Sequence, residues 1–152
     1  MQTKPATTND AEERSRWLSH ARLRYDQKFR DGSELHLSTH GLLLQVDLQR
    51  AFVAGAWSAV IVLAQAIIEA TLRDLVTQDY ESKAGSVFKG HKRLERIRML
   101  RNELLHPQAA GTESLVWRVA GGDIRANHAA LEVDARRAVE YMFYVVYAQH
   151  DA

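Results

Sequence analysis

An uncharged, mostly apolar run from Ala51 to Ile68 restricts the possible folds of this chain more than any other feature. The run approaches the length of a membrane-spanning helix, but Arg50 and Glu69 bound it closely, and it is interrupted by Gly55, Ser58 and Gln65. A helix that is apolar nearly all round is typical of the centre of a helical bundle. We therefore expect this run to form a largely buried helix, with a membrane span as the alternative.

Residues that break helices are scarce in the chain. Its 152 residues include two prolines and eight glycines, and 46% are apolar against 26% charged, a balance typical of globular domains. The long stretches rich in Ala, Leu, Arg and Glu favour helices over short strands. Because this length suits one domain with one core, we predict an all-α fold, an up-and-down bundle of about five helices.

Apolar residues recur at helical spacing in several segments. The predicted helices are 10–29, a second that begins at Glu34 or Leu42 and ends at Phe52, 56–76, 91–106 and 129–149. Asp10 and Asn127 can cap the first and the last of these helices, and Gly55 marks a tight turn. Before the last helix a small β-hairpin is predicted from Leu115–Val119, the turn Gly121–Asp123 and Ile124–Ala126.

The sequence excludes several classes of function. It has no cysteine and can therefore form no disulfide, Cys-ligated metal site or thiol nucleophile. His36 and His40 have the i, i+4 spacing of metal ligands, but no third ligand accompanies them, and we interpret them as surface histidines. We expect neither a metal nor a cofactor. Residues 1–9 are polar and lack the apolar core of a secretory signal, so we expect a flexible tail, followed by a single helical domain over 10–152, in a cytoplasmic protein that binds no membrane.

Positive charge gathers in one segment, although the whole chain has a net charge of only +1. Between Lys89 and Arg101, a single acid, Glu95, stands among six basic residues. We predict that an anionic partner, RNA, contacts the middle of this segment through Lys92, Arg93 and Arg96. The alternative is an ordinary solvated helix face.

The segment from Arg101 to His106, Arg-Asn-Glu-Leu-Leu-His, holds residues suited to chemistry. An arginine followed by a polar residue and, after four intervening positions, by a histidine resembles the motif of the HEPN superfamily. The likeness extends over residues 35–110, where 42–75 resembles the paired core helices of the family, and more loosely over the terminal helix. The resemblance implies a helical domain with metal-independent endoribonuclease activity, of the kind found in toxins and defence effectors.

The residue types suit that reaction. Attack of an RNA 2′-hydroxyl on the adjacent phosphate needs a proton acceptor, a proton donor for the leaving oxygen and positive charge beside the phosphate. Imidazole exchanges protons near neutral pH, so His106 is the candidate general acid or base. Arg101 offers a fixed charge for phosphate oxygens, and Asn102, one helical turn before His106, is the candidate positioning residue.

A single histidine in each chain does not readily serve as both acid and base. The resemblance implies a homodimer in which two motifs face one cleft and, for toxins of this family, a protein antitoxin. Some of these antitoxins modify a tyrosine two residues after the motif histidine, where this chain has Gln108. That form of regulation does not fit this sequence. An antitoxin or another protein partner that acts by steric blocking is the alternative.

A structural role for the same residues is the alternative. Winding 94–105 at about 100° per residue places Arg101 within the apolar stripe, while Asn102 and His106 fall to one side. Arg101 would then pair with Glu69, and its loss would destabilise the fold by roughly 3 kcal/mol. His106 would cap backbone carbonyls. The chain would be a non-catalytic binding or dimerisation module; a regulator that binds nucleotides or nucleic acid without cutting is the third hypothesis.

Overall fold

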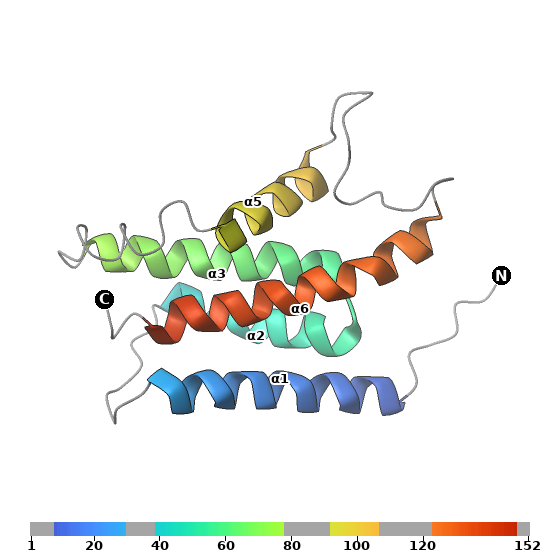
Figure 1. Ribbon diagram of the computed structural model, residues 1–152, viewed down its shortest axis with the longest axis horizontal. Coiled ribbons are helices and arrows are strands. Elements are labelled where there is room, and N and C mark those ends of the chain that lie inside the picture. Colours follow the sequence, from blue (N-terminus) through green and yellow to red (C-terminus); the bar gives the residue numbers. More distant parts are fainter. Residues whose placement is uncertain (1–7, 30–38, 78–91, 107–122, 149–152) are drawn as a thin grey trace.

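The computed structural model describes residues 8–29, 39–77, 92–106 and 123–148, and all regular secondary structure within these ranges is helical. Each of these helices runs opposite to the one that precedes it in Figure 1. The predicted all-α, up-and-down arrangement is thus confirmed for the described ranges. The helices are α1 (Thr8–Phe29), α2 (Thr39–Ala54), α3 (Trp57–Thr77), α5 (Lys92–Leu105) and α6 (Ile124–Ala148).

Helix α3 lies at the centre of the bundle, as the uncharged run that ends at Ile68 predicts. It packs against α2, α5 and α6, and five of its side chains have no exposed surface: Val60, Ile61, Ala64, Ile67 and Ile68. The hydroxyl of Thr71 is also buried, and it donates a hydrogen bond of 2.8 Å to the carbonyl of Ile67 one turn earlier. None of the described helices combines the length and the apolar character that crossing a membrane requires.

Helix α6 is the second central element, and the remaining helices flank it and α3. Helix α1 packs against α2 and α6, whereas α5 lies on the other side of the bundle, against α3 and α6 (Figure 1). The inner face of α6 contributes a row of buried side chains, which includes Leu131, Ala135, Ala138, Val139, Met142 and Val146. Because α5 is an outer helix, the motif that it carries lies near the surface of the bundle.

The predicted tight turn at Gly55 is confirmed. Gly55 has a φ of 72°, a conformation that residues with a Cβ rarely adopt, and its amide donates to the carbonyl of Phe52 at 3.0 Å. A Cβ at this position would lie 3.0 Å from the guanidinium carbon of Arg14, whose Nη1 donates to the carbonyl of Val53 at 3.1 Å. Glycine therefore lets α1 approach the α2–α3 turn closely.

Helix α6 begins earlier than the sequence predicts. The Asp123 carboxylate accepts hydrogen bonds from the amides of Arg125 and Ala126, at 3.0 and 3.3 Å, so Asp123 caps this helix. The predicted cap, Asn127, lies inside the helix instead, where it is buried and its Nδ2 donates to the carbonyl of Asp123. The predicted second hairpin strand, Ile124–Ala126, is therefore wrong because these residues form the first turn of α6; Leu115–Val119 lies outside the described residues.

The other boundaries agree more closely with the sequence. Helices α1, α3 and α5 each begin and end within two residues of the predicted positions. Helix α2 begins at Thr39, between the two starts that the sequence leaves open, and it ends two residues after Phe52. Asp10 lies in the first turn of α1 rather than at its cap. Of the predicted tail, 1–7 is outside the described residues, and the helix already includes Thr8.

Candidate functional site

The HEPN-like motif occupies the C-terminal end of α5. Arg101 and Asn102 lie within the helix, and His106 follows its last residue, one position beyond the helix end at Leu105. The amide of His106 still donates to the carbonyl of Asn102 at 2.8 Å, which keeps the two residues one turn apart. Their side chains are exposed and form no hydrogen bond with any described residue. Within that part of the chain, the structure therefore does not show the capping role considered for His106.

Arg101 turns toward α3, as its position in the apolar stripe predicts. Its Nη2 lies 3.2 Å from Oε1 of Glu69, so the predicted pair is confirmed. The side chains of Arg101 and Glu69 are 27% and 39% exposed. The pair is accordingly in contact with solvent at the edge of the bundle, and it is not the fully buried pair that the structural alternative assumes.

Gln65 is a third member of this arrangement, and the sequence analysis missed it. Its side chain is 1% exposed, and its Nε2 donates to the same Glu69 oxygen at 2.8 Å. The sequence does contain a sign of this contact, because Gln65 is a polar residue one turn before Glu69 in a run that is otherwise apolar. Oε1 of Gln65 is buried and accepts no hydrogen bond from the described residues. Glu69 thus has one partner on its own helix and a second on α5.

Exposed apolar side chains flank the outward-facing part of the motif. Met99 is 54% exposed and Leu105 is 51% exposed, while Asn102 and His106 lie between them around the helix. The opposite face of α5 is buried through Leu94, Ile97 and Leu100. The outer face therefore combines two polar groups suited to chemistry with apolar surface that water solvates poorly.

The predicted RNA-binding residues lie at the other end of α5. Lys92, Arg93 and Arg96 are all exposed, and Arg96 is about 15 Å from His106 along the helix axis. Nη2 of Arg96 is 3.5 Å from Oδ1 of Asp134 on α6, a carboxylate that is 2% exposed. Arg93 and Arg96 thus face α6, whereas Arg101 faces α3. The structure does not gather these arginines on one face with Asn102 and His106.

The described residues contain no candidate metal site, because no three of their His, Asp or Glu side chains lie close enough together to hold an ion. His40 is exposed on α2, and His36 lies outside the described residues. Trp17 and Trp57 pack with Phe52 and are therefore not placed as a base-stacking surface.

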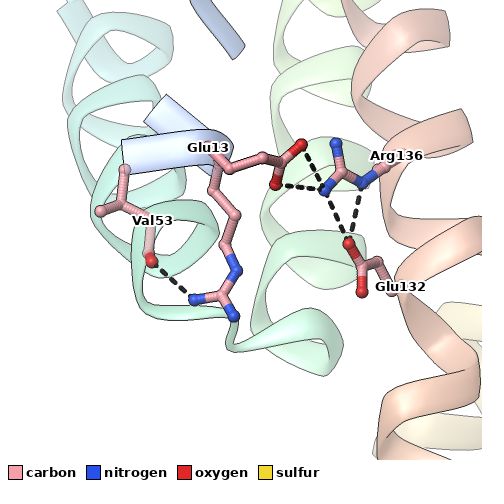
Figure 2. A network of polar contacts seen from close by, with 5 residues as sticks. Glu13, Val53, Glu132 and Arg136 are labelled. Atoms are coloured by element: carbon pink, nitrogen blue, oxygen red, sulfur yellow. Dashed lines mark hydrogen bonds and ion pairs between the residues drawn. The ribbon is translucent and has the colours of Figure 1, made fainter. Parts of the chain in front are cut away.

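A second polar cluster, which the sequence analysis did not predict, joins α1 to α6. Figure 2 shows the Arg136 guanidinium between Glu13 and Glu132, at 3.0 and 2.7 Å. It also lies 4.8 Å from the ring centre of Trp17. Burial opposes the charge on Arg136, but the hydrogen bonds with the two carboxylates outweigh it and raise its pKa. This cluster is best explained as a structural clamp, since its cation is already bound by two acids.

Comparison with protein-family models, curated proteins and solved structures finds no match for this chain. The resemblance to the HEPN superfamily is a likeness in motif and helix order. The case for a function accordingly depends on α5 and the residues around it.

Proposed function

We propose that this protein is a metal-independent endoribonuclease of the HEPN type. In this proposal His106 acts as general acid or base, Arg101 binds the phosphate and Asn102 positions the substrate or the imidazole. The observation that carries the proposal is the joint exposure of Asn102 and His106 at the end of α5, a few residues along the chain from the partly exposed side chain of Arg101. These are the groups that RNA cleavage requires.

The reaction is an internal transfer at phosphorus. The 2′-oxygen of a ribose attacks the neighbouring phosphate, a bond forms between that oxygen and phosphorus, and the bond from phosphorus to the 5′-oxygen breaks. One imidazole accepts the 2′-hydroxyl proton, and a second, protonated imidazole donates a proton to the leaving oxygen. The products are a 2′,3′-cyclic phosphate and a 5′-hydroxyl end.

The need for two imidazoles supports a homodimer as part of the proposal. A two-fold contact along the outer face of α5 would bring the His106 residues of two copies to one cleft. Met99 and Leu105 beside this histidine supply exposed apolar surface, which an interface between copies would bury.

Arg101 must bind phosphate in this mechanism while Glu69 competes for it. An ion pair in contact with solvent contributes only about 0.2–1 kcal/mol, so the phosphodiester of RNA or the more highly charged transition state can displace the carboxylate. Gln65 continues to donate to Glu69 when Arg101 moves, which lowers the cost of the exchange. The same carboxylate can hold the guanidinium near the motif before RNA binds.

Removal of the motif histidine tests this proposal. Purified protein should cut RNA in the presence of a chelator and leave cyclic phosphate ends, and His106→Ala should reduce the rate by at least about a hundredfold. The exposed position of His106 predicts an unchanged thermal midpoint. His20→Ala, which removes an exposed histidine from α1, is the matched control and should cut like wild type. Undiminished cleavage by His106→Ala would refute the assignment.

A non-catalytic dimerisation module is the second candidate, and the contact of Arg101 with Glu69 favours it. In that case the arginine serves to fasten α5 to α3. A wild-type dimer that leaves RNA intact, together with loss of the dimer in Leu105→Glu, would support this candidate over the nuclease.

A further inference from the structure

A groove between α5 and α6 lies on a different side of α5 from Asn102 and His106. It has a volume of about 230 Å³. The lining residues are Arg93, Arg96, Ile97 and Leu100 from α5, and Asp134, Arg137 and Glu140 from α6. Ile97 and Leu100 form the floor of the groove, since they are only 5% and 1% exposed. The groove therefore has an apolar base with charged groups around it.

The charges around the groove are unequal. Asp134 contacts Arg96 at 3.5 Å, and Glu140 contacts Arg24 of α1 at 3.0 Å. Among the residues that line the groove, three arginines stand against these two carboxylates. Arg137 is exposed and forms no ion pair with any described residue. The groove is thus electrostatically suited to an anion.

The buried carboxylate of Asp134 also fixes one of the cations. Its side chain is 2% exposed, and it holds the Arg96 guanidinium through Nη2 at the groove wall. A guanidinium has five N–H donors in a planar fork, so this contact leaves donors for a second oxyanion. Arg96 and Arg137 can then bind oxygens of one phosphate from α5 and α6.

We propose that this groove binds a nucleoside phosphomonoester through its phosphate, at Arg96 and Arg137. A phosphomonoester carries a charge of about −1.5 to −2 near neutral pH, which two guanidinium groups can bind through charged hydrogen bonds. A free mononucleotide and the phosphorylated end of an RNA strand share this chemistry. The site goes beyond the proposed cleavage and does not depend on it.

Calorimetric titration of the full chain tests the site with four ligands: AMP, adenosine, and a 2′-O-methyl oligoribonucleotide with a 5′-phosphate or a 5′-hydroxyl. AMP should bind at least about tenfold more tightly than adenosine, because charged hydrogen bonds to the phosphate are lost without it. Arg137→Gln should weaken AMP binding by about tenfold or more. The matched control is Arg125→Gln, an exposed arginine of α6 that does not line the groove, and it should bind like wild type.

The outcomes separate the two sources and the two proposals. Preference for the 5′-phosphorylated strand over AMP identifies an RNA end as the ligand, and the reverse identifies a free mononucleotide. Equal binding of AMP and adenosine, no binding of any phosphorylated ligand, or unchanged binding by Arg137→Gln overturns the site. His106→Ala should bind AMP like wild type, so loss of cleavage in that variant and failure of the groove are distinguishable.

Discussion

Arg101 is the residue on which the structural and the catalytic hypotheses differ most. Its guanidinium contacts Glu69, yet 27% of the arginine side chain and 39% of the glutamate side chain remain exposed. Water can therefore solvate either group when the other is removed. Removing one partner therefore costs much less unfolding free energy than breaking a buried pair would.

Arg101→Ala should consequently reduce the free energy of unfolding by about 1 kcal/mol, not by the roughly 3 kcal/mol expected of a buried pair. A double-mutant cycle with Glu69→Ala, followed by urea denaturation, measures the coupling directly. The exposed pair Arg98–Glu95, at 3.1 Å on α5, is the matched reference. A coupling energy of about 3 kcal/mol would mean that the pair holds α5 in place, and it would favour the non-catalytic module.

The sequence predicts this region well where helix geometry decides it. The 3.6-residue period alone placed Arg101 toward the core and Asn102 and His106 to one side, and the charge of Glu69 in an apolar helix identified the partner. Gln65 was missed although it stands one helical turn before Glu69 on α3, at the i, i+4 spacing that lets the two side chains meet. How deeply Gln65 is buried depends on the way the neighbouring helices pack around α3, which the spacing does not specify.

At the scale of helices, the attachment of α1 depends on more than its apolar stripe. Arg136 of α6 binds Glu13 of α1 (Figure 2), and it lies over the ring of Trp17. Trp17 in turn stacks on Phe52 of α2, with ring centres 5.1 Å apart. One guanidinium thus connects three helices through an ion pair and an aromatic stack.

Arg136→Met should reduce the free energy of unfolding by about 2 kcal/mol, because charged hydrogen bonds and a cation–π contact are lost while the side-chain volume is nearly kept. Glu13 and Glu132 are 55% and 39% exposed, so they regain water and the loss stays moderate. Urea denaturation measures the change in the unfolding free energy of the whole domain. Hydrogen exchange should show that α1 opens more easily in the variant. The exposed neighbour Arg137→Met should change stability by less than about 0.5 kcal/mol. Equal effects of the two variants would contradict the clamp.

The ends of helices were predicted less well than their existence. The apolar period located α1, α3 and α5, but Gly121-Gly122-Asp123 resembled a hairpin turn, and the same aspartate instead caps α6. A short polar turn before apolar residues is compatible with a strand or a helix. The capping hydrogen bonds from Arg125 and Ala126 decide between them, and they form only once the helix exists.

Across the whole molecule, the order of layers follows from the apolar content of the helices. Helix α3, which carries no charged residue before Glu69, lies inside, and the more polar α1 and α5 lie on opposite sides (Figure 1). Ion pairs between the helices join distant parts of the chain, such as Arg24 with Glu140 and Arg136 with Glu13. Since many charged residues are available at the surface, the sequence does not specify which of them meet.

The stability of the whole bundle should fall at high pH because of Tyr141, which is 1% exposed in the core. Burial and the neighbouring Tyr144 raise the pKa of Tyr141 to about 12, against the opposing effects of Arg93 and Arg98. An unfolded tyrosine has a pKa of about 10 and releases its proton first. The stabilisation that the protonated Tyr141 hydroxyl gives the fold is therefore fully present below pH 10, and it is lost as pH rises toward 12.

Tyr141→Phe isolates this effect, because it removes the titrating group and leaves the ring. Between pH 10 and pH 12, wild type should lose up to about 3 kcal/mol more of its unfolding free energy than the variant. Urea denaturation at a series of pH values measures both curves, and the other groups that titrate in this range affect the two proteins alike. Tyr25, whose pKa is also raised, chiefly by burial, should preserve part of the decline in the variant. Parallel curves for the two proteins would show that the Tyr141 hydroxyl ionises as readily in the fold as in the unfolded chain.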